Sequence, residues 1–518
     1  MHENRETSIS TGRDERRSPA GEGRCRTARM NDVEESDRPV VPVSRPNKAE
    51  ESAAEAGEGR GRTKENTSPS HTLSTQREAG VSQGWRGVRE AATERKQERF
   101  TALLHHLNVD LLRESFHALK RQAAPGVDGV RWREYEIGLE DRIMDLHSRV
   151  HRGAYRAQPS RRVYIPKADG RQRPLGIASL EDKIVQQAVA TILNAIYEVD
   201  FKGFSYGFRP GRSPHQALDA LNVGICRKRV NWILDADIRG FFDNMSHEWT
   251  EKFVQHRVAD PRILRLIHKW LKAGVSEEGK WSETKVGTPQ GAVISPLLAN
   301  IYLHYVFDQW VDAWRKRRAK GEVIVVRYAD DLVLGFEQRE DVDRFLGKFR
   351  ERLAKFGLEL HPDKTRVIEF GRYAESNRGK RGEGKPETFD FLGFTHYCGT
   401  KKGRFIVWRK TAGKRMRAKL QQLKQELRRR MHEPLAQVGE WLGKVQRGYY
   451  QYHAVPGNSA ALGRFRDRLF WLWWRIVGHR SERRMRWKSY RLLFHRWVPY
   501  PRILHPYPSV RFDAMHPR

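Results

Sequence analysis

Cysteine is scarce in this sequence. Its 518 residues contain three cysteines, Cys25, Cys226 and Cys398, which lie far apart and form no Cys-x-x-Cys pair. This spacing excludes a disulfide framework and a zinc site built on paired cysteines. Because disulfides are rare where thiols stay reduced, we expect an intracellular protein.

Long apolar runs are also missing. No uncharged apolar stretch approaches the roughly 18–20 residues that a membrane-spanning helix needs. The most apolar stretch near the C-terminus, residues 469–474, is short and flanked by Arg468 and Arg475. The N-terminus carries acids as well as arginines, so it has the pattern of neither a signal peptide nor a transit peptide. We therefore expect no membrane partner.

Aromatic residues are nearly absent from residues 1–85, which are rich in Gly, Ser, Glu and Arg and reach their first aromatic residue at Trp85. Such a segment buries too little apolar surface to fold. The composition predicts a disordered, basic N-terminal extension over 1–85. Met30 is an alternative start of translation.

Acidic residues are outnumbered, because 97 Lys and Arg against 64 Asp and Glu give a net charge of +33 at pH 7. Phosphate is the partner that most naturally neutralises such charge. A membrane-surface protein and a neutral enzyme with a basic tail are the alternatives. Basic residues recur along the chain, at 161–173, 313–320, 401–417, 427–430 and 475–492. This distribution favours a nucleic-acid partner.

The hydrophobic pattern changes at about residue 98, where strand and helix signals begin to alternate. The expected strands are 163–167, 173–177, 231–238, 323–328 and 332–336, and the expected helices include 184–193, 297–311 and 342–356. Asn108 or Asp110 is expected to cap an early helix. After about 405 the chain is predicted to be helical and very basic to about 495, and then to end in a Pro-rich tail. The pattern predicts an α+β catalytic region followed by an all-α domain.

Two acidic sites stand inside apolar strands. Asp237 follows Asp235 in one strand, and Asp330 and Asp331 lie between two further apolar runs. Buried carboxylates are costly unless cations accompany them, and aspartates from two strands suit Mg²⁺. Two such ions would activate a hydroxyl and stabilise a leaving pyrophosphate. The alternative is that the Asp-Asp pair is only a polar hairpin tip.

The order of several motifs resembles the group II intron-encoded reverse transcriptase/maturase family of bacterial type. The matching segments are Ile-Pro-Lys at 165–167, Arg-Pro-Leu-Gly-Ile at 173–177, Tyr-Gly-Phe-Arg-Pro-Gly-Arg-Ser at 206–213, Asp-Ile-Arg-Gly-Phe-Phe-Asp at 237–243, Gly-Thr-Pro-Gln-Gly at 287–291, Tyr-Ala-Asp-Asp at 328–331 and Phe-Leu-Gly-Phe at 391–394. A lone Tyr-x-Asp-Asp is weak, but these blocks in family order are specific, and the match runs from about 98 to 500.

The resemblance implies a right-hand polymerase with reverse-transcriptase fingers and palm, followed by an all-α thumb and maturase domain. The implied divisions are 86–404 for fingers and palm, 405–430 for the thumb helix region, 431–500 for the maturase domain and 501–518 for a C-terminal tail. The family's fold also implies that Asp237 and Asp330 hold two Mg²⁺ ions. Asp331 would complete the cluster, and the backbone carbonyl of Ile238 would add a metal ligand.

The resemblance also implies contacts with the substrate. Lys167 and Arg173 would bind the triphosphate, and Gln290 would touch the templating pair. Phe242 would exclude a ribose 2′-hydroxyl, unless it is an ordinary core residue. Lys364 would donate a proton to pyrophosphate, with a plain phosphate-binding or solvated lysine as the alternative.

The segment 391–394 would support the primer strand, or else be a plain core strand. In the basic helical end, aromatic residues alternate with arginines, a pattern that suits RNA, although most of these aromatics are expected to be core. Many family members carry a C-terminal His/Cys-rich nuclease, and this sequence shows no such motif. We therefore expect no endonuclease activity and a DNA primer made elsewhere.

The resemblance implies an RNA-directed DNA polymerase that is also a maturase for a group II intron RNA. Its other partners would be a DNA primer, target DNA and deoxynucleoside triphosphates, in the bacterial cytoplasm. One alternative is a reverse transcriptase adapted to another task, against which the maturase-like end argues. The other is a splicing factor with a dead polymerase, against which the intact Asp237, Asp330 and Asp331 set argues.

Overall fold

The computed structural model describes residues 87–516 apart from 167–171, 285, 289–290 and 481–484, all within the compact unit Ser44–Arg518. The extension predicted over 1–85 lies outside the described residues. Lys167 and Gln290 lie outside them too.

The first described layer is helical. It contains α2 (Val109–Ala118), α3 (Trp132–Glu136) and α4 (Leu139–His151), after the short turn η1 (Leu104–His106). The side chain of Asn108 accepts a hydrogen bond of 2.8 Å from the backbone N–H of Leu111, so Asn108 is the predicted N-cap of α2. The indole of Trp132 donates to the Phe116 carbonyl and stacks on its ring, which joins α3 to α2.

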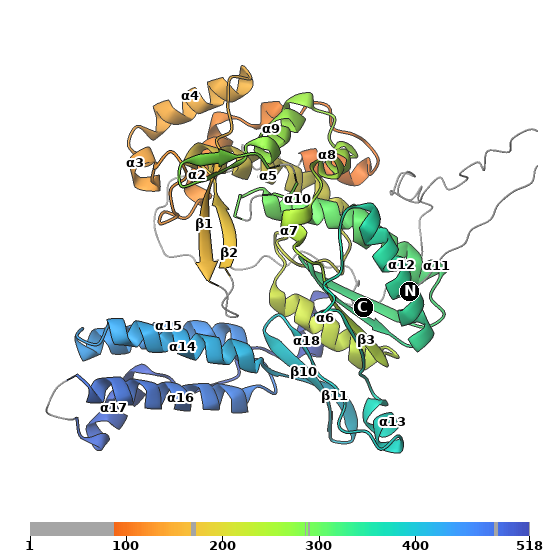
Figure 1. Cartoon of the computed structure of the whole chain (residues 1–518), viewed down its shortest axis with the longest axis vertical. Helices are drawn as coiled ribbons and strands as arrows, with labels where there is room; N and C mark the ends of the chain where they lie inside the picture. Colours follow the sequence, from red (N-terminus) through yellow and green to blue (C-terminus); the bar gives the residue numbers. More distant parts are fainter. Residues whose placement is uncertain (1–86, 167–171, 285, 289–290, 481–484, 517–518) are drawn as a thin grey trace, which may run out of the picture. The chain divides into compact units, whose positions relative to one another are not determined.

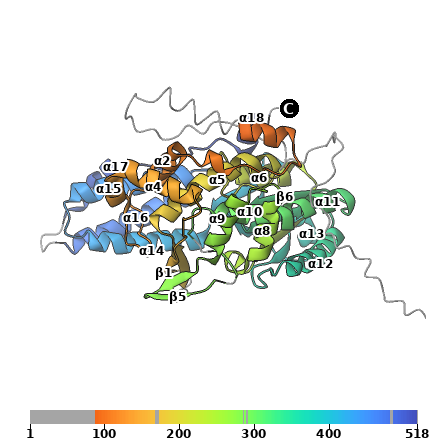
Figure 2. The same cartoon turned by 90° about the horizontal axis from the view of Figure 1, so that it is seen from above.

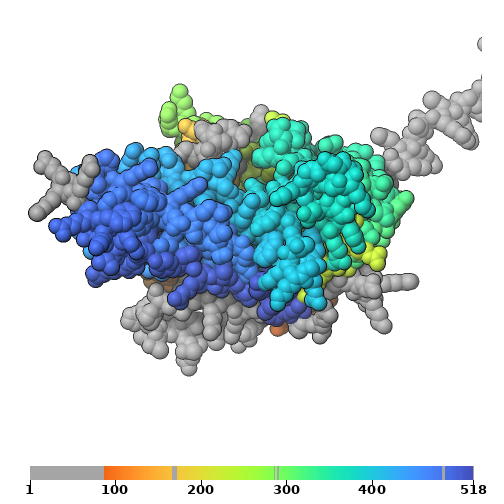
Figure 3. All heavy atoms as spheres, turned by 90° about the horizontal axis from the view of Figure 1, so that it is seen from below, coloured from red at the N-terminus to blue at the C-terminus, as the bar shows by residue number. Residues whose placement is uncertain are grey.

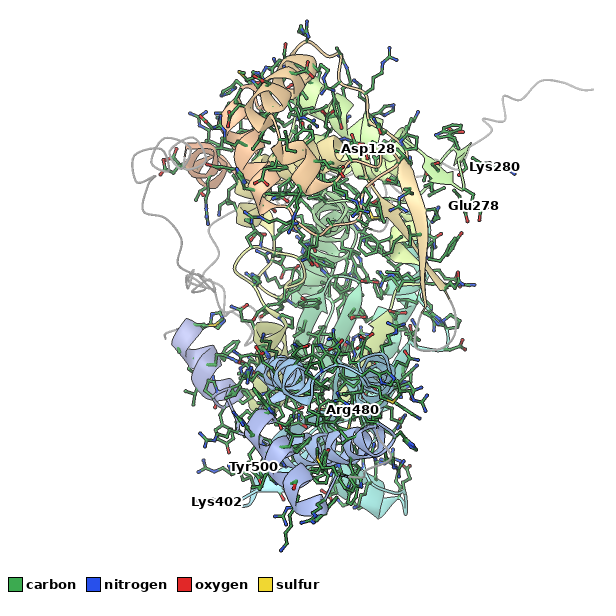
Figure 4. All side chains as sticks on the ribbon, turned by 90° about the vertical axis from the view of Figure 1, so that its left-hand side faces the viewer. Asp128, Glu278, Lys280, Lys402, Arg480 and Tyr500 are labelled. Carbon is green, nitrogen blue, oxygen red and sulfur yellow. The ribbon has the colours of Figure 1, made fainter. Side chains whose placement is uncertain are left out.

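A four-stranded sheet follows, in the order β2-β1-β4-β5. Its strands are β1 (Ser160–Pro166), β2 (Gln172–Ile177), β4 (Val275–Glu277) and β5 (Lys280–Ser282). Strands β1 and β2 pair antiparallel and, over the described residues, match the strands predicted at 163–167 and 173–177. Glu278 and Lys280 mark the tip of the β4–β5 hairpin (Figure 4). The long helix α5 (Leu180–Asp200) follows β2 in the chain, and Ser179 caps its N-terminus.

The central sheet has the order β6-β7-β3-β8 (Figure 1). Its strands are β3 (Trp232–Asp237), β6 (Val323–Tyr328), β7 (Asp331–Phe336) and β8 (Arg366–Glu369). Helix α6 (Pro214–Arg227) packs on β6, and α12 (Arg339–Lys355) packs on β3 and β7. The strands predicted over 231–238, 323–328 and 332–336 are confirmed.

The helix predicted over 297–311 is present but irregular. It consists of α10 (Ser295–Leu303), a π-helical turn η2 (His304–Asp308) and α11 (Gln309–Arg317). Further helices between β3 and β9 are α7 (Phe241–Asn244), α8 (His247–Gln255), α9 (Pro261–Lys272) and α13 (Ala374–Lys380). Helix α8 packs against both α9 and α10 (Figure 2).

The prediction of continuous helix after about 405 is wrong at its start. Residues Arg404–Thr411 form strand β11, which pairs with β10 (Phe394–Lys401), and β10 pairs with β9 (Phe389–Phe391). Along β11 the side chains of Val407, Arg409 and Thr411 are buried alternately. This period of two is a strand signal, which the density of basic residues hid.

Four helices form one bundle after β11: α14 (Gly413–Arg429), α15 (Leu435–His453), α16 (Ser459–Gly478) and α17 (Trp487–Trp497). They share a single hydrophobic core, to which α14 contributes Met416, Leu420, Leu423 and Leu427. Figure 3 shows them as one contiguous body in blue. The boundary predicted between residues 430 and 431 therefore runs through a common core.

The Pro-rich tail is not irregular throughout, because it contains helix α18 (Pro508–Met515), which packs on α6. The buried carboxylate of Asp219 on α6 holds this contact, since Arg511 of α18 and Arg409 of β11 both pair with it. Pro508 stands in the first helical turn, where a missing N–H is harmless. Within the described ranges, no helix combines the length and apolar character that crossing a bilayer requires.

A buried histidine in β10 makes the fold sensitive to acid. Burial, and next the charge of Arg409, lowers the pKa of His396 from 6.5 to about 3. Below pH 6.5 the unfolded chain takes up a proton that the folded chain does not, so the free energy of unfolding falls as the pH drops. From pH 7 to pH 5 this residue costs about 2 kcal/mol of stability.

We expect His396→Phe, whose ring stacks on Phe389 as the imidazole does, to remove this loss. Urea unfolding at pH 7 and pH 5 measures it, with the exposed His105→Phe as the control. An unchanged pH dependence in His396→Phe would contradict the prediction.

Candidate active site

Three aspartates meet at one end of the central sheet. Asp237 ends β3 and lies directly opposite Asp331, the first residue of β7. Tyr328 also pairs with Asp331, so Ala329 and Asp330 form the two-residue turn between β6 and β7. The structure thus brings the two predicted acidic sites, which are far apart in the sequence, to neighbouring strands.

The turn itself is strained. Ala329 has φ of 56°, a left-handed value that a residue with a Cβ rarely adopts. The backbone of Gly207 is pressed against this turn, since a Cβ on Gly207 would lie 2.3 Å from the Ala329 nitrogen. Such strain persists only where the surrounding structure enforces it.

A buried arginine enforces the turn. Arg327, in β6, donates to the Ala329 carbonyl at 3.1 Å and to the Asn300 side chain at 3.0 Å. Its guanidinium also forms a two-pronged ion pair with Asp308, at 2.7 and 2.6 Å, with both side chains fully buried. Asn300 in turn donates to the Gly207 carbonyl at 2.8 Å. No role was predicted for Arg327, although an arginine inside the apolar run of β6 is a signal for a buried partner.

Burial and neighbouring negative charges raise the pKa of Asp331 and of Asp330. Desolvation by the surrounding protein, and then the charges of Asp330, Asp237 and Asp235, raise the pKa of Asp331 to about 7. Burial and Asp237 likewise raise the pKa of Asp330. Because solvent reaches Asp331, screening reduces the effect of this shift on stability. A site that disfavours its own negative charge favours an added cation.

Lys364 is already at the site. Its ammonium lies 2.5 Å from a carboxylate oxygen of Asp237, so the predicted proton donor is an ion-pair partner of a predicted metal ligand. Asp235 has a looser partner in Arg366, at 3.4 Å.

The donor set fits Mg²⁺ only with substrate present. Within the described part of the chain, no group of three or more His, Cys, Asp or Glu side chains could hold a metal ion alone. Mg²⁺ commonly takes one or two carboxylates together with waters and substrate phosphates. Asp237 and Asp330 can supply the carboxylates. Ile238 lies opposite Leu360 in an isolated β-bridge. The two hydrogen bonds of this bridge run from the Arg239 N–H to the Glu359 carbonyl and from the His361 N–H to the Asp237 carbonyl. The carbonyl of Ile238 itself takes no part in the bridge.

The predicted substrate contacts that the structure describes lie around this cluster. Arg173 is exposed on β2, and its charge acts on Asp330. Phe242 is half-buried beside the buried Phe241, with ring centroids 5.4 Å apart. The backbone carbonyl of Phe242 accepts from Thr288 at 2.9 Å, which fixes the start of the 287–291 segment beside it.

A cavity of about 300 Å³ lies between the β1–β2 sheet and this segment. Its lining residues are Arg162, Pro174, Gly176, Asp243, Val275, Thr284, Val286, Gly287 and Thr288. A larger groove, of about 520 Å³, runs between α14 and α16. It is lined by Lys414, Arg417, Lys424 and Arg468 over a floor that includes Leu420 and Leu472. The groove between α14 and α16 combines positive charge with concavity, as nucleic-acid contacts require.

Comparison with known proteins agrees with this geometry. Residues 165–396 match a family model described as reverse transcriptase (RNA-dependent DNA polymerase). The chain is 36% identical over 274 residues to Protein YkfC of Escherichia coli, and the match covers 47% of this chain and 72% of that protein.

Two further relatives are matched over a smaller share of their length. The chain is 36% identical over 219 residues to the group II intron-encoded protein LtrA of Lactococcus lactis subsp. cremoris, covering 42% of this chain and 36% of LtrA. It is 31% identical over 275 residues to an uncharacterized 91 kDa protein in the cob intron of Schizosaccharomyces pombe, and the match covers 52% of this chain and 34% of that protein. The chain thus spans about a third of each of these two relatives.

The pairing of Lys364 with Asp237 makes a prediction about metal affinity. Lys364→Met removes a cation that competes for Asp237, so Mn²⁺, used as a probe for Mg²⁺, should bind about fivefold more tightly without nucleotide. Titration calorimetry measures the affinity. Lys364→Arg keeps the charge and should bind as the unaltered protein does. Lys348→Met, at an exposed position paired with Glu351, is the matched control. Equal or weaker binding by Lys364→Met would refute the competition.

The Arg327–Asp308 pair makes a second prediction. Asp308→Leu leaves a buried guanidinium unpaired and should lower the free energy of unfolding by about 3–5 kcal/mol. Adding Arg327→Met removes the stranded charge and should restore most of that loss. Mn²⁺ binding should stay weakened in the double variant, because the Ala329 carbonyl has lost its donor.

Unfolding in urea and Mn²⁺ titration separate these two effects. Asp343→Leu, which breaks an exposed pair with Arg339, should change stability by less than about 1 kcal/mol. If the double variant recovered normal Mn²⁺ affinity, the turn would not depend on Arg327.

Proposed function

The chain belongs to the group II intron-encoded reverse transcriptase/maturase family, and we propose that it copies RNA into DNA at the Asp237, Asp330 and Asp331 cluster and also binds a group II intron RNA. The observation that carries this proposal is the direct pairing of Asp237 with Asp331 across β3 and β7. Three crowded carboxylates at one strand end, among which burial and neighbouring charges raise the pKa of Asp330 and Asp331, suit metal-assisted phosphoryl transfer.

In this proposal Asp237 and Asp330 hold two Mg²⁺ ions, with Asp331 and the Ile238 carbonyl completing the set. The ions, when bound, would lower the pKa of the attacking 3′-hydroxyl and neutralise charge on the leaving pyrophosphate. Asp237 must then release Lys364, whose freed ammonium can donate a proton to the pyrophosphate.

The surrounding residues select and orient the substrate. Arg173 and Lys167 bind the triphosphate, where positive charge offsets the charge that develops in the transition state. Phe242 sits at the start of α7 with its ring half-exposed, in a position to exclude a ribose 2′-hydroxyl and select deoxynucleotides. Gln290 contacts the templating pair.

We propose that 86–404 form the fingers and palm, and that 405–430, which begins within β11, and 431–500 serve as the thumb and maturase regions around one shared core. The basic groove between α14 and α16 supports RNA binding, because its cations surround an apolar floor that suits a nucleic-acid backbone. The partners we propose are the intron RNA, a DNA primer, target DNA and deoxynucleoside triphosphates, in the bacterial cytoplasm. Binding the folded intron would promote its splicing and mobility.

Separate sites for synthesis and splicing make a testable prediction. Asp330→Ala combined with Asp331→Ala should abolish RNA-templated DNA synthesis, a loss of at least about 10³-fold, because the metal ligands are gone. Splicing of the flanking intron at low Mg²⁺ should persist, because the helical bundle is intact. Primer extension and a splicing assay on the same protein measure the two activities.

Glu340→Ala, at an exposed position on α12, is the control for both assays. Synthesis that survived the double substitution would disprove the metal-site assignment. Failure of the unaltered protein to promote splicing would disprove the maturase role.

A further inference from the structure

An exposed aromatic residue is held in a strained conformation beside the catalytic turn. Phe208 has φ of 58°, a left-handed value that is unfavourable for a residue with a Cβ. Its side chain is 55% exposed, although the residues on both sides of it, Gly207 and Arg209, are buried. An exposed ring adds nothing to the hydrophobic core, so strain and exposure together point to a function for this side chain.

The segment before Phe208 is fastened to the end of β6. Two backbone hydrogen bonds of 2.9 Å join residues 204–206 to Arg327, one donated by the Arg327 N–H and the other accepted by the Arg327 carbonyl. The next residue, Gly207, lies against the turn of the catalytic aspartates, where a Cβ would stand 2.3 Å from the Ala329 nitrogen. Phe208 therefore follows directly on a backbone that touches this turn.

A buried ion pair fixes the other side of Phe208. Arg209 pairs with Glu198 of α5 at 2.9 Å, and the arginine side chain is only 3% exposed. The same guanidinium donates to two backbone carbonyls of the preceding loop, at 2.8 and 2.7 Å. The exposed ring of Phe208 is therefore carried by a backbone that is held in place on both sides.

The ring stands on the β6 side of the carboxylates. It lies beside the ring of Tyr328, with centroids 6.5 Å apart. Tyr328 of β6 and Asp237 of β3 both lie opposite Asp331 of β7, one on each side of it. Neighbouring strands are about 4.8 Å apart, so Tyr328 and Asp237 are separated by roughly 10 Å across the sheet. Phe242 is in the helix that follows β3, so it leaves the sheet on the opposite side of Asp331 from Phe208.

This placement identifies the ligand of Phe208. In the proposed reaction Phe242 contacts the incoming nucleotide, on the β3 side. In an in-line displacement the attacking oxygen and the leaving group lie on opposite sides of the transferred phosphorus. With the incoming nucleotide over β3, the end of the strand that attacks it, and the base pair that contains this end, lie over β6. An exposed aromatic ring suits the sugars and bases of such a duplex.

We propose that Phe208 packs against the terminal base pair of the primer–template duplex and holds the end of the primer at the catalytic turn. The contact is apolar and is made to the sugars and base edges, while Tyr328 supports the ring from the side. Phe208 is thus a binding residue for the duplex and not for the triphosphate. This inference rests on the proposed DNA synthesis, and it gives a role to a residue of the 206–213 motif for which none was predicted.

Replacement by glycine separates binding from folding. Phe208→Gly removes the ring and also the left-handed strain, so the thermal unfolding temperature should stay the same or rise. The Kd for a DNA primer annealed to an RNA template should rise about tenfold, because an aromatic contact with the duplex is lost. The KM for the nucleoside triphosphate, measured with saturating primer–template, should not change.

Two further variants control for the chemistry and for the strain. Phe208→Tyr keeps an aromatic ring and should retain most of the affinity for primer–template. Lys402→Gly relieves a similar left-handed φ, of 49°, at the exposed turn between β10 and β11, where Lys402 is labelled in Figure 4. It should leave the Kd for primer–template unchanged, because strain is relieved there without loss of an aromatic contact.

A photo-crosslink tests the contact directly in the full chain. The photoreactive residue p-benzoylphenylalanine replaces Phe208, and the protein is irradiated with primer–template in which each strand is labelled in turn. Crosslinks should map to the terminal base pair or to the base pair next to it. The same replacement at Tyr373, an exposed aromatic residue at the start of α13, should give no crosslink to the duplex end.

Crosslinks from position 208 only to the unpaired template or to the triphosphate, or to neither strand, would overturn the proposal. So would a fall in the unfolding temperature of Phe208→Gly with no change in primer–template affinity, since the residue would then be structural. A rise confined to the triphosphate KM would place the ring at the wrong ligand. If the unaltered protein bound the duplex but made no DNA, the proposed polymerase function would fail instead, and the crosslink would still decide what Phe208 contacts.

Discussion

The buried ion pair between Arg327 and Asp308 is the contact on which the active-site geometry depends. Arg327 links strand β6 to the Ala329 carbonyl and to the Asn300 side chain, and Asp308 neutralises its charge at full burial. A pair of this kind adds little net stability compared with apolar residues of the same size. What it adds is geometry, because a guanidinium with fixed partners can hold a strained carbonyl in one place.

The partner Asp308 is placed by an irregular helix. It is the last residue of the π-helical turn His304–Asp308, which widens the helix between α10 and α11. The loosened carbonyls of Tyr305 and Val306 accept from the buried Arg352 of α12, at 3.0 and 2.7 Å. Two buried arginines therefore contact the π-helical turn. Arg352 donates to its backbone carbonyls, and Arg327 pairs with the carboxylate of Asp308 at its end. Irregular turns of this type are frequent at functional sites.

Much of this arrangement was predictable from sequence, because it rests on local patterns. Continuous apolar runs predicted strands β6 and β7, and Asn108 was predicted as a possible cap of the helix that is α2. The prediction that Asp237 and Asp330–Asp331 meet needed the resemblance to a family, since nothing local fixes which strands pair. Strand β11 was missed because its alternation is carried by Arg409 and Thr411, which are buried only through distant partners. Helix α18 was missed for a similar reason, since its docking depends on Asp219, far away in sequence.

The charges around the carboxylates explain how a strongly basic protein keeps a cation site. Lys364 pairs with Asp237, while Arg173 and Arg415 influence Asp330 and Asp331 from different elements. Their attraction does not offset desolvation and mutual repulsion, because the pKa values of Asp330 and Asp331 remain raised. The cluster therefore still favours a further cation.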